Sequence, residues 1–282
     1  MIITPLSEAL GAEVRGIDLR RVGNDDLEEI KAAFLKFQML CFRDQELSPQ
    51  AQLEFSAGFG EIESRADRPF TFPGIPEVSI LSNRIHKGQP VGVINAGDFW
   101  HSDLSFGVRP CRATFLYALE VAEDGGDTEW SNMYTALDRL PLSLRSRIEG
   151  LHGIHVFDRR RNPRAEVDRQ FQKDAESVYG VSIADAIHPI VRTHPETGRK
   201  ALYISPRFVV GIEGIPGEKG QKLLDELFEF QIKPEFRYRH KWRAGDLVMW
   251  DNSCLIHIGR GKIKPPGIRH MHRTMVLGEK PY

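Results

Sequence analysis

The feature that most constrains the fold of this chain is a series of short β-like segments separated by glycine and proline. The segments cover residues 77–83, 98–106, 112–122, 126–132, 201–210, 236–242 and 246–252. Helical patterns stand before and between them, at residues 24–38, 134–151 and 217–232. Many strands, with helices at one end and in insertions, predict a mainly β fold with flanking α-helices, organised as a jelly-roll sandwich.

The N-terminal part carries the clearest local signals. Asn24 is expected to cap the first helix, whose apolar side chains share one face: Leu27, Ile30, Phe34 and Phe37. The next six residues, MLCFRD, predict a short buried strand. Ser48 followed by Pro49 predicts the start of a second helix.

Length and charge bound the domain count and the kind of partner. A chain of 282 residues, 41% of them hydrophobic, can bury one large core, so we expect residues 1–282 to form a single domain. The formal net charge of -1 gives no bias toward nucleic acid or acidic membranes. We therefore expect a small-molecule partner, with no nucleic acid and no membrane involved.

The N-terminus and the cysteines indicate the compartment. No basic region is followed by a long apolar run, and no stretch approaches the length of a membrane span, which predicts a cytoplasmic protein. Cys41, Cys111 and Cys254 are odd in number and far apart. They are expected to be reduced core residues rather than members of a disulfide framework or a structural zinc site.

Three polar residues interrupt the apolar strand patterns. If residues 98–106 form a strand, His101 and Asp103 point to the same face, because side chains at i and i+2 do so. His257 follows a second hydrophobic strand and a turn at Asp251 and Asn252, which we expect to support and orient His257. Two histidines and one carboxylate are the facial triad that holds non-haem Fe(II) and leaves three coordination positions open.

Four motifs carry a family resemblance. HSD at 101–103, GGDTEW at 125–130, WDNSCLIH at 250–257 and RHMHRTMVLGEKPY at 269–282 resemble, in order and spacing, the iron(II)- and 2-oxoglutarate-dependent taurine/2,4-dichlorophenoxyacetate dioxygenase family. The similarity extends to the N-terminal ITPLSEALGAEVRGIDL and the central HPIVRTHPETGRKALYI, and so covers nearly the whole chain.

The resemblance implies the fold and the site residues. The implied fold is a double-stranded β-helix, a cupin-like jelly roll. The implied iron ligands are His101, Asp103 and His257, while Thr128 and Arg269 hold the distal carboxylate of 2-oxoglutarate. The implied cofactors are Fe(II), 2-oxoglutarate as cosubstrate, and O2.

The resemblance also implies the reaction. Oxidative decarboxylation of 2-oxoglutarate to succinate and CO2 is coupled to hydroxylation of a small anionic organic substrate, aryloxyalkanoate-like or sulfonate-like. If the hydroxylated carbon bears oxygen or sulfur, the product fragments.

Physical chemistry supports two arginines in one pocket. A guanidinium binds a carboxylate through a planar pair of hydrogen bonds, and a threonine hydroxyl adds a neutral donor. In RHMHR, alternation places Arg269 and Arg273 on one face of an extended chain, with His270 and His272 on the other. One distal carboxylate does not need both arginines, so Arg273 is the candidate for the substrate anion.

Further substrate contacts are suggested by position within the family. Phe157 and Phe208 fall where the taurine branch has aromatic pocket walls, and Asn95 lies near the position of its substrate-binding asparagine. In GEIESRADRPF this chain lacks the sulfonate-binding histidine of that branch, and Arg65 or Arg68 could supply a cation instead. We therefore expect a substrate other than taurine, with aryloxyacetates favoured.

Two other classes of protein fit part of the pattern. A zinc-dependent hydrolase could use the same three ligands, but it would not need Thr128 and Arg269. A non-catalytic jelly-roll ligand-binding protein would need neither the ligands nor the arginine. We expect the protein to be a homo-oligomer, either a dimer or a tetramer.

Overall fold

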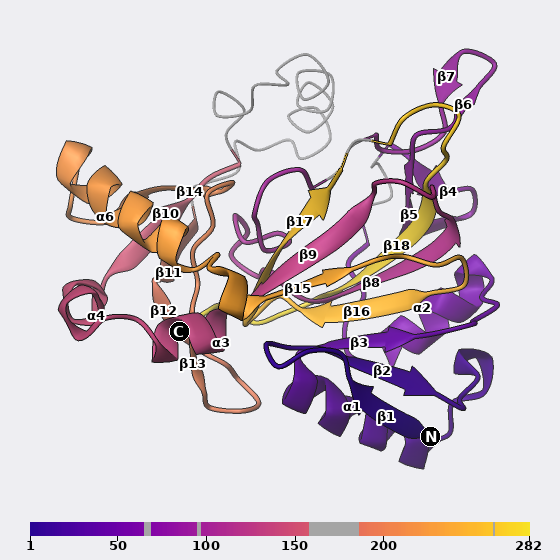
Figure 1. Ribbon diagram of the computed structural model, residues 1–282, viewed down its shortest axis with the longest axis horizontal. Helices are drawn as coiled ribbons and strands as arrows, with labels where there is room; N and C mark the ends of the chain where they lie inside the picture. Colours follow the sequence, from indigo (N-terminus) through magenta and orange to yellow (C-terminus); the bar gives the residue numbers. More distant parts are fainter. Residues whose placement is uncertain (65–68, 95–96, 158–185, 262) are drawn as a thin grey trace.

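The computed structural model describes residues 1–64, 69–94, 97–157, 186–261 and 263–282, and it is mainly β with a few helices (Figure 1). Its largest sheet has eight strands in the order β1-β2-β3-β16-β8-β18-β5-β4. Their bounds are Ile2–Pro5, Ala12–Arg15, Met39–Phe42, Leu247–Asp251, Cys111–Glu120, His270–Leu277, Ile75–Ser82 and Thr71–Phe72. Strands far apart in the sequence are therefore neighbours at the centre of this sheet.

A three-stranded sheet packs on one face of the large sheet. Its order is β15-β9-β17, with bounds Arg237–His240, Asp127–Asn132 and Leu255–Arg260. Trp130 of β9 contacts Trp250 of β16 with ring centroids 5.5 Å apart, and Trp250 contacts His257 of β17 at 4.8 Å. The space between the two sheets is thus an apolar core that also contains His257, a predicted site residue.

Helices cover the opposite face of the large sheet. α1 (Asn24–Phe37) and α2 (Pro49–Ala57) bury Phe34 and Phe55 in one apolar cluster with Phe115 of β8. The remaining helices within the described residues are α3 (Met133–Asp138), α4 (Leu142–Ile148), α6 (Gly217–Phe230) and the 3-10 helices Leu19–Arg21 and Pro234–Phe236.

Short strands complete the described chain. They are β6 (Ile85–His86), β7 (Gln89–Pro90), β10 (His152–His155), β11 (Ala186–Pro189), β12 (Val191–Thr193), β13 (Lys200–Leu202) and β14 (Val209–Ile212). β6 pairs with β7, β12 with β13, and β10 lies between β11 and β14. Figure 1 shows α3, α4 and α6 gathered with β10–β14 at one end of the molecule.

Several sequence predictions are confirmed, and local chemistry explains two errors in the helices. Ser48 caps α2 by accepting a hydrogen bond from the Ala51 amide at 3.1 Å. The prediction that Asn24 caps α1 is wrong, because Asn24 is already helical and Gly23 occupies the cap position without a side-chain bond. The predicted helix 134–151 is two helices, α3 and α4, separated at Pro141, whose ring cannot continue a helix.

The strand predictions at 77–83, 112–122, 126–132, 236–242 and 246–252 correspond to β5, β8, β9, β15 and β16. The predicted strand 201–210 is wrong at its centre, because a turn separates β13 from β14. The predicted strand 98–106 is also wrong, since only His101 makes a β-bridge there. Leu104, with φ of 55°, takes the left-handed conformation that a strand cannot accommodate.

The helices and the cysteines each bear on a property of the chain as a whole. Within the part of the chain that the structure describes, no helix combines the length and the apolar character that crossing a bilayer requires. All three cysteines are free and buried, as predicted.

Candidate active site

His101 and His257 lie opposite each other across an isolated antiparallel bridge. Each backbone amide donates to the other residue's carbonyl, at 2.9 Å from His101 and 2.8 Å from His257. Residues paired in this way project to the same side, and the two imidazole centroids are 4.1 Å apart. β17 therefore positions one ring, and the loop that touches it positions the other.

Asp103 reaches the same place by side-chain hydrogen bonds rather than by strand alternation. The Asp103 amide donates to Asn252 Oδ1 at 3.0 Å, and Ser102 Oγ donates to the Asn252 carbonyl at 2.8 Å. These bonds fix the loop against the turn after β16. The expected convergence of His101 and Asp103 is present, although the strand geometry from which we predicted it is absent.

The three side chains form a group that could hold a metal ion. Asp103 Oδ1 lies 3.6 Å from His101 Nε2, and Asp103 Oδ2 lies 3.8 Å from His257 Nε2. The ligating atoms all lie within 4.8 Å of one another. His101 Nδ1 contacts the Phe99 carbonyl at 2.7 Å. Because a carbonyl only accepts hydrogen bonds, Nδ1 carries the proton, and the lone pair of Nε2 is available to bind a metal.

Electrostatics favours the protonation states that bind a metal. Burial and the neighbouring His101 lower the pKa of His257 to about 3, so its imidazole is neutral. Burial opposes ionisation of Asp103, but polar surroundings that include the positively charged Arg273 outweigh it and hold the pKa of Asp103 below its ordinary value. A neutral imidazole and an ionised carboxylate are the donor forms that Fe(II) accepts in a facial triad.

Two further groups of candidate ligands lie close together among the described residues: Cys41 with His240 and Asp246, and His194 with Asp251 and Cys254. His194 Nε2 bonds Asp251 Oδ2 at 2.9 Å, and its Nδ1 accepts two backbone amide bonds. Asp246 Oδ2 accepts from Arg43, from the Arg243 amide and from His240. In both groups the imidazole Nε2 and one carboxylate oxygen are already paired with each other.

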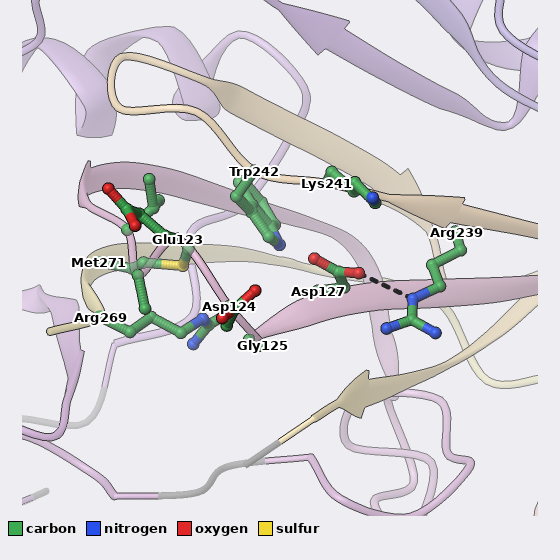
Figure 2. Close-up of a pocket in the computed structure, with 12 residues that line it drawn as sticks. Glu123, Asp124, Gly125, Asp127, Arg239, Lys241, Trp242, Arg269 and Met271 are labelled. Carbon is green, nitrogen blue, oxygen red and sulfur yellow. Dashed lines mark hydrogen bonds and ion pairs between the residues drawn. The ribbon is translucent and has the colours of Figure 1, made fainter. Parts of the chain in front are cut away.

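Arg269 and Thr128 border the same cavity as the two histidines, together with Arg273. Burial lowers the pKa of Arg269 to about 10. Its Nε is buried without a hydrogen-bond partner, and no carboxylate within the described ranges pairs with its guanidinium. Figure 2 shows the contrast with Arg239 across the adjoining pocket, where Arg239 Nε bonds Asp127 at 2.8 Å.

Several neighbours hold Arg269 and Thr128 in place. The Arg269 amide donates to Asn83 Oδ1 at 2.9 Å, and the guanidinium lies 6.0 Å from the Trp242 ring centroid. Trp242 Nε1 donates to Thr128 Oγ1 at 3.0 Å. A Cβ at Gly126, which has φ of 76°, would lie 3.1 Å from Arg269 Cδ, so the close approach favours glycine.

The predicted shared face of Arg269, directly before β18, and Arg273, within β18, is confirmed. Arg273 lines the cavity with Arg269, and its Nη1 lies 3.8 Å from Asp103 Oδ1. His272 instead packs against Phe72 with ring centroids 5.5 Å apart. The two arginines therefore share one site, as the RHMHR pattern predicts.

Aromatic rings stand beside the three candidate metal ligands. The Phe208 centroid lies 6.1 Å from that of His101 in an edge-to-face arrangement. Phe106 contacts Phe208 at 5.0 Å and Phe157 at 4.8 Å. Arg207 lies over the Phe208 ring at 5.2 Å. Phe106, Thr114, Trp242 and the specific role of Asn252 escaped the sequence analysis, while the predicted residues Arg65, Arg68 and Asn95 lie outside the described residues.

Comparison with known proteins gives concordant matches. A family model described as taurine catabolism dioxygenase TauD, TfdA family, matches residues 2–275. An alpha-ketoglutarate-dependent 2,4-dichlorophenoxyacetate dioxygenase of Cupriavidus pinatubonensis is 35% identical, covering 92% of each chain. An (S)-phenoxypropionate/alpha-ketoglutarate-dioxygenase of Sphingobium herbicidovorans is 30% identical, covering 90% of this chain and 88% of that one. The crystal structure of AAD-2 in complex with Mn(II) and N-oxalylglycine is similar with a TM-score of 0.82, 30% identity and 99% coverage of both chains.

Proposed function

Because the chain belongs to the taurine catabolism dioxygenase TauD, TfdA family, we propose that His101, Asp103 and His257 bind the Fe(II) of a 2-oxoglutarate-dependent dioxygenase. One observation carries this assignment. Three metal-ligating atoms converge beside a cavity whose other wall holds Arg269 and Thr128, the donors that an anionic cosubstrate needs.

The fold supports the same assignment. The packing of β15-β9-β17 against the large sheet, with helices on the outer face, is consistent with a double-stranded β-helix of the jelly-roll type. The matched residues 2–275 span nearly the whole chain, which supports a single dioxygenase domain over residues 1–282. The cytoplasmic location and the dimeric or tetrameric assembly stay predictions from the sequence.

The enzyme is an oxidoreductase that uses Fe(II), 2-oxoglutarate and O2. When bound, these groups supply the oxidising chemistry that yields succinate and CO2 and adds a hydroxyl group to the substrate. The chain positions them. The imidazoles and the Asp103 carboxylate would hold the metal on one side and leave the other side open.

Arg269 and Thr128 would bind the distal carboxylate of 2-oxoglutarate. The guanidinium offers a planar fork to both carboxylate oxygens, and it has no competing carboxylate among the described residues. Thr128 Oγ1 accepts from Trp242, so its own proton is free to donate to the cosubstrate. A zinc hydrolase would not require this second half of the site.

Arg273 and the phenylalanine wall define the proposed substrate class. Arg273 supplies a cation close to the metal-ligating group, while Phe208 and Phe106 supply an apolar, aromatic surface beside His101. A small anion with an aryl group complements both features. Two relatives are named for 2,4-dichlorophenoxyacetate and phenoxypropionate, so we propose an aryloxyalkanoate-like substrate ahead of a sulfonate. Hydroxylation beside the ether oxygen would give a product that fragments.

The test is a substrate screen with a spectroscopic control. Anaerobic addition of Fe(II) and 2-oxoglutarate should produce a weak visible charge-transfer band. Admission of O2 should then form succinate with aryloxyalkanoates, more slowly with sulfonates and least with taurine. The absence of the band at saturating Fe(II) contradicts the assignment of the metal and cosubstrate sites. Faster turnover of taurine than of any aryloxyalkanoate contradicts the substrate class.

A further inference from the structure

A buried hydroxyl holds one oxygen of Asp103. Thr114 lies in β8 and is fully buried, and its Oγ1 donates to Asp103 Oδ2 at 2.6 Å. A short bond to a carboxylate is among the stronger hydrogen bonds in proteins, especially away from water. Thr114 thus constrains a candidate metal ligand without belonging to the ligand set.

The direction of this bond is fixed by Asn252. Its Oδ1 accepts from the Asp103 amide at 3.0 Å and from Trp250 Nε1 at 3.2 Å, and both of these groups can only donate. Asn252 Nδ2 must therefore be the atom facing Thr114 Oγ1, to which it donates at 3.0 Å. Since Thr114 Oγ1 accepts this bond, its single proton is directed to the carboxylate.

Without this constraint, both oxygens of Asp103 could reach one metal ion. Oδ1 lies 3.6 Å from His101 Nε2, and Oδ2 lies 3.8 Å from His257 Nε2. A carboxylate that binds through both oxygens fills one more coordination position than one that binds through a single oxygen. A dioxygenase of this kind needs about three open positions for cosubstrate and oxygen, so the second oxygen has to be kept away.

We propose that Thr114, oriented by Asn252, is a positioning residue that makes Asp103 bind the metal through Oδ1 alone. The proposal rests on the assignment of His101, Asp103 and His257 as metal ligands. It assigns a function to the Asn252 turn that differs from the sequence prediction, which placed this turn in support of His257. The hydrogen bonds of Asn252 lead to Asp103 instead.

The chain offers a matched control. Thr274 of β18 is also fully buried, and its Oγ1 bonds Ser56 Oγ at 2.6 Å, away from the metal-ligating group. Thr114→Val and Thr274→Val each remove one buried hydroxyl from the centre of the large sheet with little change in shape. Only the first is expected to alter the metal site.

The experiment counts the water molecules bound to Mn(II) in the enzyme, using water-proton relaxation and electron paramagnetic resonance. The parent protein and Thr274→Val should show about three exchanging waters, and Thr114→Val should show one fewer. Thr114→Ser, which keeps the hydroxyl, should restore the parent spectrum. Succinate formation by Thr114→Val should fall by about 10- to 100-fold, as is usual when a group that orients a metal ligand is lost.

If Thr114→Val is poorly folded, Thr114→Ala removes the same hydroxyl without adding an atom to the core and gives the same comparison. An unchanged water count in a folded variant that lacks the hydroxyl overturns the proposal, as does Thr114→Ser behaving like Thr114→Val. If the parent protein binds no Mn(II), the metal-site assignment itself fails, and this inference fails with it.

Discussion

The two halves of the site differ in how completely the protein satisfies the polar groups of Asp103 and His101 on one side and of Arg269 on the other. His257 Nδ1 is the exception on the first side, since it is buried without a partner among the described residues. On the metal side, the Asp103 amide bonds Asn252, its carboxylate bonds Thr114, and His101 Nδ1 contacts a backbone carbonyl. On the cosubstrate side, the backbone of Arg269 is anchored by Asn83, but the buried Nε has no partner in the described parts of the chain.

This difference distinguishes a preorganised half, which holds the proposed metal ligands, from a half whose buried guanidinium has no anion bound to it. Ligands fixed by surrounding bonds are already in place when a metal binds, so little order has to be gained on binding. A buried guanidinium without an anion costs free energy in the folded protein, and a bound carboxylate relieves that cost. Arg239 of the adjoining pocket provides the comparison, because its guanidinium is paired with Asp127 and its side chain is half-exposed.

The largest effect is expected from the preorganised half. Replacing His101, Asp103 or His257 with alanine should reduce substrate-dependent succinate formation to background and abolish tight Fe(II) binding, because each supplies one of the three atoms proposed to hold the metal. His86→Ala is the control, since His86 is an exposed residue of β6. Full activity of His257→Ala with unchanged iron content would contradict the triad.

The next largest effect is expected at Arg269. Arg269→Ala should raise the KM for 2-oxoglutarate, because losing one partner of a buried charged contact typically costs about 2 to 5 kcal/mol. Thr128→Ala should raise it less, since a neutral donor is lost. The measurement is a 2-oxoglutarate titration at saturating substrate and Fe(II).

Arg239→Ala serves as the matched control for Arg269→Ala. It removes a guanidinium from the wall of the adjoining pocket, but one that already has a carboxylate partner (Figure 2). Its titration curve should follow that of the parent. If the curves of Arg269→Ala and the parent coincide, the unpaired guanidinium is not the cosubstrate anchor.

A smaller and more selective effect is expected at Arg273. Arg273→Lys keeps the charge near Asp103 but loses the planar fork, so the KM for the best aryloxyalkanoate should rise roughly tenfold, while the KM for 2-oxoglutarate changes little. Paired titrations of both compounds give the answer. A defect confined to 2-oxoglutarate would move Arg273 into the cosubstrate half.

The sequence predicted the members of this site better than it predicted their support. The ligand set came from the resemblance, and the shared face of Arg269 and Arg273 came from simple alternation along an extended chain. Both arginines line one cavity, with Arg269 directly before β18 and Arg273 within it. The strand expected at 98–106 is a loop, because Ser102 and Asp103 bond the Asn252 turn and only His101 pairs with a neighbouring strand.

The supporting contacts escaped prediction for a physical reason. Asn252 is 138 positions from Thr114 and 149 from Asp103, and Trp242 is 114 from Thr128. No local periodicity relates such residues, and only the tertiary fold brings their donors and acceptors together. Residues that bind a ligand directly belong to recurrent motifs, whereas residues that orient them become identifiable only once distances are known.

The smallest expected effect concerns such a supporting residue, Trp242. Trp242→Phe removes the Nε1 donor to Thr128 but keeps an aromatic ring near Arg269. The loss of one neutral hydrogen bond corresponds to about 0.5 to 1.5 kcal/mol, so the KM for 2-oxoglutarate should rise by a few fold. The kcat should change less, because the metal ligands are untouched.

A double-mutant cycle distinguishes orientation of Thr128 from a general packing role of the indole. If Trp242 acts through the Thr128 hydroxyl, Trp242→Phe should have no further effect on the KM for 2-oxoglutarate in a Thr128→Ala background. Fully additive effects would show that the indole acts independently of Thr128. In that case the effect of Trp242→Phe on the KM for 2-oxoglutarate would be explained by the contact between the indole and Arg269. Arg269 would then be the group through which Trp242 supports cosubstrate binding.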